Sequence, residues 1–341
     1  MRTILIPVTA LLAVLVGCAP SPSSAAGAGD APSAGAGAVT LTSCGLDVTV
    51  PAPPQRAVTL EQGATELLLA LGLEDRMVGT SYLTDAVAPE YADAYAAVPV
   101  LAAQYPTAEQ LRAADPDFVY SMRASAFGPD AVGARAELAD LGVPAYLSAN
   151  DCEDPSLVTG DTGFDRIFAE VTDLAAVFGV EDRGAELVRE QQEVLDAVTA
   201  SAADAGDLDV AWLYSTIDGA PIVAGGTGLP QTLTELAGGR NAFADLDAQW
   251  AETSWDEIAQ RDPDVLVLAD LSRGLAGDSA ADKTAMLRDD TVTAELSAVR
   301  ADRLVAIPAT EMDPSVRSVD ALATLSDALV GFAGADAGAD A

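Results

Sequence analysis

The sequence contains no histidine and few basic residues, and both shortages exclude functions. Its 341 residues include 17 Lys+Arg against 53 Asp+Glu, which gives a formal net charge of −36. Because so acidic a chain offers no basic footprint for phosphates, we expect no nucleic-acid partner. Without histidine, Ser-His-Asp and Cys-His nucleophiles are impossible and the commonest transition-metal ligand is missing. Since only 3 cysteines are present, we expect no zinc or manganese site either.

Lysine is almost absent, which removes further classes of catalysis. The single lysine is Lys283, and no serine lies three residues before it, so a Ser-x-x-Lys acylation centre is missing. The glycine-rich stretch 225–228 lacks the Gly-Lys-Ser/Thr ending of a phosphate loop, and a turn before a helix that Pro230 opens explains it. The enzyme class left open is a glycoside hydrolase with paired carboxylates. So acidic a chain always supplies such pairs, so their presence says little.

The first residues have the pattern of an export signal. Residues 1–17 carry one arginine and an apolar run from Ile4 to Val16, which is too short for a spanning helix. The stretch Leu15-Val16-Gly17-Cys18 resembles the lipobox of bacterial lipoproteins, in which cleavage leaves the cysteine as the acylated first residue. This resemblance implies an extracytoplasmic protein anchored to the cell membrane through Cys18. The alternative is an ordinary secretory signal in which that cysteine is incidental.

Low-complexity segments flank the expected folded part. Residues 18–42 are mainly Ala, Gly, Ser and Pro and are expected to form a flexible tether, and the tail 333–341 is expected to be disordered. With Cys18 acylated, Cys44 and Cys152 remain, and an even pair in an oxidising compartment suggests one disulfide. Two free thiols are the alternative.

Apolar runs alternate with helical patterns between these ends. Strands are expected at 56–60, 77–80, 117–122, 144–147, 209–214, 221–224, 265–269 and 304–307. Helices are expected at 64–71, 108–114, 130–141, 230–237, 255–261 and 319–332. This alternation indicates parallel α/β units. The stretch 179–205 follows helical spacing, and about 20 residues at 1.5 Å each give a rod of roughly 30 Å.

An internal repeat divides the chain into two halves. The segment 107–119 matches 254–266 in register, with a hydroxyl cap, an acid, a helix, Asp-Pro-Asp and an apolar strand. A weaker match pairs 65–67 with 234–236, each followed by a glycine that ends a helix. We therefore predict an α/β fold with two Rossmann-like lobes, residues 43–178 and 206–332, joined by one long helix over 179–205. A ligand cleft is expected between them, and the single helix implies little lobe closure.

The order of these motifs resembles the substrate-binding lipoproteins of ABC importers, in the class with a helical interlobe backbone. The resemblance extends from Cys44 to Phe332 and rests on 56–60 with 65–72, the two Asp-Pro-Asp units, and 316–322. It implies a monomeric, non-catalytic receptor without a cofactor, which delivers a chelated or bulky solute to an importer permease.

The family pairs an acidic residue on each lobe with arginines of the permease. By position these acids are Glu109 and Asp256. Family members usually carry glutamate at the second position, so Asp256 is a departure, and Glu257 beside it is the substitute candidate. The alternative is that these acids only favour the helix dipole.

The loops that follow the strands are expected to hold the ligand. The candidates are Tyr82, Gln104, Tyr105, Arg123, Ser125 and Phe127 in the first lobe, and Tyr214, Trp250, Arg273 and Met312 in the second. Arginine suits carboxylate, phosphate or catecholate oxygens, and Tyr and Trp offer flat stacking surfaces. For each aromatic residue, ordinary core or rim packing is the alternative.

The family carries iron–siderophores, haem and cobalamin, and a ferric siderophore is the preferred ligand here. Haem is disfavoured because no histidine can be its axial ligand, although tyrosine could. Cobalamin and a deazaflavin cofactor precursor are the alternatives, since proteins that carry such solutes have similar motifs. The stretch 116–120, with Cys44 and Cys152, is also similar to proposed deazaflavin-precursor binders.

Overall fold

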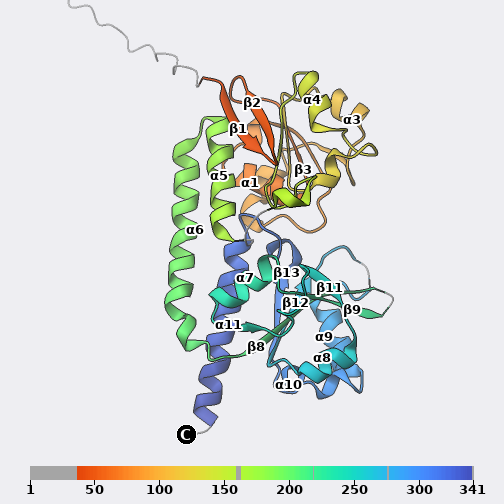
Figure 1. Cartoon of the computed structure of the whole chain (residues 1–341), viewed down its shortest axis with the longest axis vertical. Coiled ribbons are helices and arrows are strands. Elements are labelled where there is room, and N and C mark those ends of the chain that lie inside the picture. The colour runs from red at the N-terminus through yellow and green to blue at the C-terminus, as the bar shows by residue number, and fades with distance from the viewer. Residues whose placement is uncertain (1–36, 159–162, 218, 275, 340–341) are drawn as a thin grey trace, which may run out of the picture. The chain divides into compact units, whose positions relative to one another are not determined.

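Two separate β-sheets form the centres of two lobes (Figure 1). The computed structural model describes residues 37–158, 163–217, 219–274 and 276–339. The expected signal peptide and Cys18 lie outside these residues. The predicted α/β fold class, with two lobes and a long helix between them, is confirmed. No helix in the described part of the chain is both long and apolar enough to span a bilayer.

The N-terminal lobe contains a parallel sheet of five strands. In sheet order these are β5 (Val100–Ala102), β4 (Met77–Ser81), β3 (Ala57–Leu60), β6 (Phe118–Ser121) and β7 (Ala145–Leu147). The helices of this lobe include α1 (Gln62–Ala70), α2 (Ala92–Tyr95), α3 (Ala108–Ala113) and α4 (Arg135–Asp140). Every residue of β3 and β6 is buried, as expected for central parallel strands covered on both faces. All five strands end at the same edge of the sheet, which is where the site lies.

A hairpin precedes this sheet. Its strands β1 (Val39–Ser43) and β2 (Leu46–Val50) pair antiparallel, so residues 39–42 are strand and the expected tether is wrong at that end. The two turn residues both have positive φ, which is the geometry of a tight hairpin turn. One of them, Cys44, forms a disulfide with Cys152, with a Cα–Cα distance of 5.3 Å. The disulfide fastens the hairpin to the loop that follows β7.

The C-terminal lobe contains a mixed sheet. The order is β11 (Trp250–Glu252), β9 (Ala220–Ala224), β8 (Asp209–Ile217), β12 (Val265–Asp270) and β13 (Leu304–Pro308), and β10 (Arg240–Asn241) pairs with the start of β8. Its helices include α7 (Leu229–Leu236), α8 (Trp255–Arg261), α9 (Ala280–Asp289) and α10 (Ser297–Arg300). The expectation of parallel units throughout is wrong for β9 and β11, which pair antiparallel. Only residues 218 and 219 join β8 to β9, and so short a link permits a hairpin but not a crossover.

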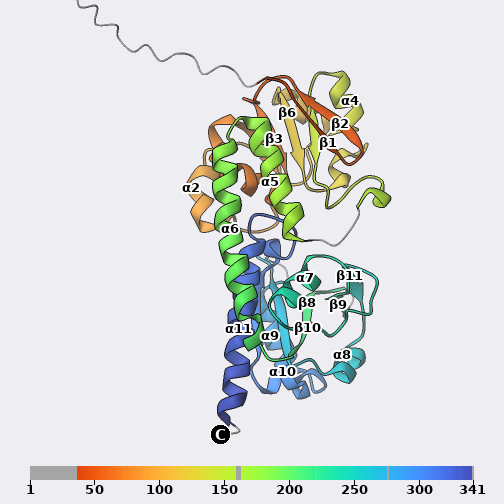
Figure 2. The ribbon, with the colours of Figure 1, turned by 60° about the vertical axis from the view of Figure 1, so that its left-hand side comes forward.

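Three long helices pack side by side along the lobes. They are α5 (Phe164–Phe178), α6 (Glu181–Ser201) and α11 (Ser318–Ala339). Two of them, α5 and α6, contact the cores of both lobes. Figures 1 and 2 both show α6 beginning beside α5 and ending beside α11. The predicted single helix is therefore α6, but it is packed between two others. Sequence analysis identified neither α5 nor its role.

The apolar cores of the two lobes meet on these helices. Phe168 of α5 belongs to the core of the C-terminal lobe, whereas Phe178 of the same helix belongs to that of the N-terminal lobe. Val188 of α6 packs against both cores. Gln191 of α6 also donates a hydrogen bond to the carbonyl of Val316, 2.7 Å away, just before α11. The two lobes are therefore joined by continuous side-chain packing along these helices and not by a hinge at one flexible point.

The predicted disorder of the tail is wrong for its described residues. Helix α11 continues to Ala339, because its alanines favour a helix and its other side chains find partners on the C-terminal lobe. Arg303 forms an ion pair with Asp336, and its guanidinium lies 5.7 Å from the ring centre of Phe332.

The repeated segment folds in the same way in both lobes. Thr107 and Ser254 cap α3 and α8, as predicted, by accepting the backbone N–H three residues on, at 3.2 and 3.1 Å. Asp115 and Asp262 follow these helices with φ of 50° and 41°. Asparagine and aspartate tolerate this left-handed region better than most residues, which explains the choice of aspartate there.

The second aspartate of each Asp-Pro-Asp unit fixes the neighbouring strand. Asp117 accepts hydrogen bonds from the N–H groups of Gln55 and Arg56 at 2.8 and 2.9 Å, beside the start of β3. Asp264 accepts one at 2.9 Å from the N–H of Asp209, which begins β8. The same side chain therefore aligns the central strand of each sheet.

Of two smaller expectations, one is wrong and one is confirmed. The expected helix over 130–141 begins only at Arg135. The glycine-rich stretch 225–228 is a turn before α7, as predicted. A Cβ on Gly226 would lie 2.1 Å from the carbonyl oxygen of Ala244, so a close backbone approach requires this glycine.

Candidate ligand-binding site

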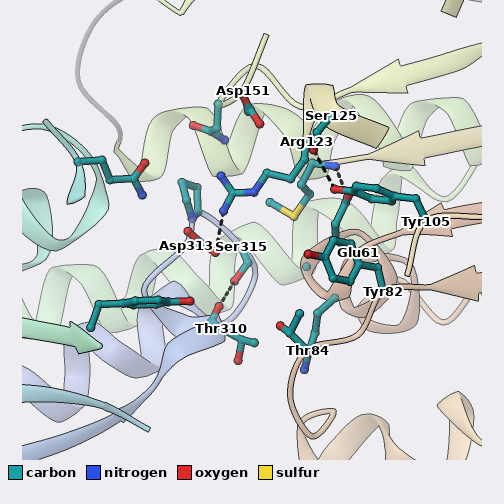
Figure 3. A pocket seen from close by; sticks show the side chains of 17 residues that line it. Glu61, Tyr82, Thr84, Tyr105, Arg123, Ser125, Asp151, Thr310, Asp313 and Ser315 are labelled. Atoms are coloured by element: carbon teal, nitrogen blue, oxygen red, sulfur yellow. Dashed lines mark hydrogen bonds and ion pairs between the residues drawn. The ribbon is translucent and has the colours of Figure 1, made fainter. Parts of the chain in front are cut away.

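A cavity of about 540 Å³ lies where the carboxyl ends of the strands of both lobes meet (Figure 3). The first lobe contributes residues that follow all five strands of its sheet: Glu61, Gln62, Gly63, Tyr82, Thr84, Tyr105, Met122, Arg123, Ser125, Asn150 and Asp151. The second lobe contributes Tyr214, Gln249, Thr310, Asp313, Pro314 and Ser315. This is the position at which open α/β sheets bind ligands.

Glu61 is the first residue after β3, and it carries a buried carboxyl group at the cavity wall. Its φ of 73° is a strained conformation for a residue with a side chain. The carboxylate accepts hydrogen bonds from the hydroxyl of Ser121 (2.9 Å) and from the N–H of Met122 (3.0 Å). Burial raises the pKa of Glu61 to about 7, although these hydrogen bonds and nearby Arg123 act in the opposite direction. Glu61 can therefore both donate and accept near neutral pH.

Two tyrosines form the wall beside Glu61. The rings of Tyr82 and Tyr105 meet edge to face, with centroids 4.7 Å apart and an angle of 83° between the planes. The Tyr105 hydroxyl lies 3.1 Å from the hydroxyl oxygen of Ser125. Burial raises the pKa of Tyr105, and the neighbouring Glu61 raises it further, so the phenol keeps its proton. This wall offers a flat apolar surface and a hydroxyl donor.

An ion pair crosses the cavity from lobe to lobe. The Nη2 of Arg123 lies 2.8 Å from the Oδ2 of Asp313, and both side chains remain partly exposed, at 39% and 40%. Figure 3 shows this pair between Asp151 on one side and Ser315 on the other. Among the described residues, Arg123 supplies the only guanidinium that lines this cavity, and it is already paired with a carboxylate.

A second cavity, of about 520 Å³, shares Arg123, Tyr214 and Asp313 with the first. Its wall contains Trp250, whose ring centre lies 4.8 Å from that of Tyr214. Arg273 also lines it and holds Asp278 with two hydrogen bonds of 2.6 and 3.1 Å. The two cavities are adjoining chambers of one site.

The structure brings together most of the predicted ligand residues. Tyr82, Tyr105, Arg123, Ser125 and Tyr214 line the first chamber, and Trp250 and Arg273 line the second, with Arg123 and Tyr214 again. Gln104 lines neither chamber, and instead it lies on an open groove with Tyr82 and Ser272.

Two of the predicted ligand residues are buried in the cores and line neither chamber. Met312 is 1% exposed and belongs to the core of the C-terminal lobe, so it cannot contact a ligand in either chamber. Phe127 is buried in the core of the N-terminal lobe. Both follow strands in sequence, but their apolar side chains gain more by packing inward than by facing a cleft that contains water.

Sequence reasoning missed the carboxylates of the site. Glu61 directly follows the strand expected at 56–60, so the rule that selected Tyr82 and Arg123 would also have selected it. Asp313 is next to the selected Met312. Asp151 follows the strand expected at 144–147 more closely than the selected Phe127 follows its own strand, so the same rule would also have found it. Gln249 precedes β11 and carried no comparable signal. Among the described residues, no group of three Cys, Asp or Glu side chains is arranged to hold a metal ion.

The acids expected to meet a permease lie away from the chambers. Glu109 and Asp256 are exposed in the first turns of α3 and α8. Glu257 is half-buried and forms an ion pair with Arg261 at 2.8 Å. Glu257 is therefore already engaged within its own helix.

Comparison with solved structures shows related proteins. A periplasmic binding protein from Veillonella parvula is 26% identical, with a TM-score of 0.74, over 86% of this chain and 98% of that one. A structure described as an ABC-type Fe3+-hydroxamate transport system from Saccharomonospora viridis is 27% identical, with a TM-score of 0.69, over 85% and 98%.

Sequence comparison agrees with the structural one. A vitamin B12-binding protein from Yersinia pestis is 26% identical over 224 residues, which cover 65% of this chain and 72% of that protein. Residues 58–311 match the family model described as periplasmic binding protein. These relatives are described as binding or transport proteins and not as enzymes. The chain belongs to the periplasmic binding protein family, whose members are the solute receptors of ABC importers.

Proposed function

We propose that this protein is a lipid-anchored receptor that binds a ferric siderophore and passes it to an importer permease. The two-chamber cleft carries the proposal, because aromatic walls, hydroxyl groups and paired charges in one interlobe site suit a bulky polar chelate. The similarity to the Fe3+-hydroxamate transport protein supports this choice of solute. The lipobox-like stretch ending at Cys18 supports the anchor.

Cobalamin is the second candidate solute. The observation in its favour is the similarity to vitamin B12-binding proteins over 224 residues. The chambers also supply stacking surfaces such as Tyr214 and Trp250, which a large macrocycle could use. A binding comparison separates the two solutes directly.

Tryptophan fluorescence provides the test, because the chain has 3 tryptophans in different settings. Trp250 lines the second chamber, Trp212 is fully buried, and Trp255 lies on α8. A ferric hydroxamate siderophore should quench the mature protein in a saturable way. Trp250→Phe should remove most of this quenching, whereas the control Trp255→Phe should retain it. Saturable binding of cyanocobalamin without binding of any ferric siderophore would replace the proposed solute by the alternative.

The proposed contact with the permease uses Glu109 and Asp256. Both are exposed at equivalent positions of the repeat, on opposite lobes, and no ion pair engages either within the described residues. Replacing both with alanine should abolish uptake of the radiolabelled solute in cells while leaving solute binding unchanged. The matched control replaces the exposed acids Glu252 and Asp289 with alanine. Unchanged uptake by the Glu109/Asp256 double variant would refute these contacts.

A further inference from the structure

The two chambers contain more acidic than basic side chains. Of the residues that the structure describes, four with carboxyl groups line them, Glu61, Asp151, Asp278 and Asp313, against the guanidinium groups of Arg123 and Arg273. The chain has no histidine, and its single lysine is used elsewhere. Both arginines are among the predicted ligand residues, and arginine is the side chain expected to bind an anionic group of a ligand.

Each of these arginines is already neutralised by an aspartate. Arg273 makes two hydrogen bonds to the carboxylate of Asp278, so its positive charge is balanced by an internal carboxylate before any ligand binds. Arg123 pairs with Asp313 across the cleft at 2.8 Å. An anionic solute would have to displace these internal carboxylates or bind beside them.

The other carboxyl groups of the first chamber, those of Glu61 and Asp151, form no ion pair within the described residues, although Arg123 is near enough to lower the pKa of Glu61. Asp151 accepts a backbone N–H from Ala124 at 3.2 Å, and Glu61 accepts only hydroxyl and backbone donors. Their oxygen atoms are hydrogen-bond acceptors at a chamber whose one guanidinium is already paired. Such a wall favours N–H and O–H donors, and it favours ammonium groups most.

Lysine is absent from both chambers for a structural reason. Lys283 is 2% exposed and directs its ammonium to the carbonyl oxygens of Ala269, at 2.7 Å, and of Asp278. It therefore holds the loop that carries Arg273 and contributes no charge to the cleft. The surrounding surface does not compensate, because the whole chain carries a formal net charge of −36. The long-range field of the protein therefore repels anionic solutes, as the carboxylates of the chamber wall do.

We infer that the cleft selects a solute without net negative charge, which presents ammonium, amide or hydroxyl donors to the carboxylates of the first chamber. The inference rests on the proposed function and narrows its solute class. Three hydroxamates neutralise one ferric ion, whereas three catecholates leave a trianion. Neutral or cationic ferric hydroxamates fit the site, and ferric tris-catecholates do not.

A set of chelates that differ mainly in charge tests this inference. Ferric desferrioxamine B carries one pendant ammonium group, and its N-acetyl derivative is neutral with the same iron centre. Ferric enterobactin is a tris-catecholate trianion. Titration calorimetry or Trp250 fluorescence at low and physiological salt should rank the cation at least as tight as the neutral chelate. The trianion should bind more weakly by about tenfold or more.

Two variants shift the preference in opposite directions. Asp313→Asn releases Arg123, so it should strengthen binding of the trianion about tenfold and weaken the preference for the cation. Arg123→Gln leaves Asp313 unpaired and should increase that preference. Asp289→Asn removes the same charge from the exposed end of α9 and should change neither affinity. Thermal unfolding of each variant shows that it is folded.

The outcomes distinguish the two proposals. Equal or tighter binding of ferric enterobactin overturns the charge inference and leaves the ferric-siderophore proposal standing. If only cobalamins bind, the ferric-siderophore proposal fails. The charge inference is then tested by comparing the affinity of cationic aquocobalamin with that of neutral cyanocobalamin. A tighter neutral form would overturn it. Binding of none of these probes overturns both proposals.

Discussion

Arg317 and Glu66 form a buried ion pair between the lobes, with 3.5 Å between Nη1 and Oε1. Arg317 precedes α11, and Glu66 lies on α1 of the N-terminal lobe. The same guanidinium holds Glu311 at 2.6 Å. Burial raises the pKa of both carboxyl groups, although Arg317 opposes this effect. One arginine therefore keeps two buried acids together at the junction of the lobes.

Replacing Arg317 with methionine should destabilise the protein strongly. Removal of one member of a buried charged network typically costs about 3 kcal/mol or more, because the remaining charges lose their compensation. The cost should be larger at pH 8 than at pH 5, since protonation relieves the two acids at the lower pH. Thermal and urea unfolding at both pH values measure it. Arg288→Met, which removes an exposed arginine paired with Asp302, should cost less than about 1 kcal/mol.

Glu170 should make stability fall as the pH rises. It is buried and accepts hydrogen bonds from Tyr120 (2.6 Å) and Ser148 (2.7 Å), and burial raises its pKa from 4.5 to about 7. The folded state then binds more protons than the unfolded state between these values. Its contribution is fully present below about pH 4.5 and is lost as pH rises through about 7, a change on the order of 3 kcal/mol.

Glu170→Gln should therefore flatten the dependence of unfolding free energy on pH. Glutamine retains an acceptor for Tyr120 and a donor for Ser148, so the variant should be near wild type at pH 5 and more stable at pH 8. The exposed control Glu252→Gln should leave the profile unchanged. If the unfolding free energy of Glu170→Gln depended on pH as steeply as that of the wild type, the dependence would come from other acids.

The disulfide should contribute both to stability and to the shape of the site. Cys44 and Cys152 are 108 residues apart, and in the chain-entropy model a loop of that size is worth about 4–5 kcal/mol. Cys152 follows Asn150 and Asp151, which line the first chamber. The double variant Cys44→Ser/Cys152→Ser should unfold at lower urea concentration and bind solute more weakly. Reduction of the wild type should reproduce both effects and should not alter the double variant.

Two glycine-to-alanine substitutions should have opposite effects on stability. A Cβ at Gly226 would lie 2.1 Å from the carbonyl oxygen of Ala244, so Gly226→Ala should cost about 1–3 kcal/mol through a forced backbone shift. At Gly331, within α11, a Cβ meets nothing within 4 Å, and Gly331→Ala should stabilise by about 0.5–1 kcal/mol through helix propensity. Thermal unfolding of both variants measures this contrast. A destabilised Gly331→Ala would show that the end of α11 is not helical in solution.

Local patterns were sufficient to predict most of the elements that the site rests on, but not β5, which precedes Tyr105, or β11, which carries Trp250. Thr107 and Ser254 cap the helices that their spacing predicts, and the Asp-Pro-Asp units have equivalent roles in both lobes. Hydroxyl caps, helix-ending residues and apolar strands act within a few residues, so one sequence is enough to find them. The long α6 was predicted for the same reason.

The interactions that decide the chemistry of the cleft act over long sequence distances. Arg123 and Asp313 are 190 positions apart, so no local pattern could show that the arginine is paired. The pairing of Arg317 with Glu66 of the other lobe could not be predicted for the same reason. Met312 was chosen and Asp313 was not, because position in the chain indicates a loop but does not indicate which way a side chain points.

The three packed helices between the lobes have a consequence for the transport cycle. Because α5 and α6 contact both cores, Glu109 and Asp256 should keep nearly the same separation with and without solute. Empty receptors would then fit the permease almost as well as loaded ones and would compete with them for docking. Uptake should therefore depend on the fraction of anchored receptors that carry solute, and excess empty receptor should inhibit import.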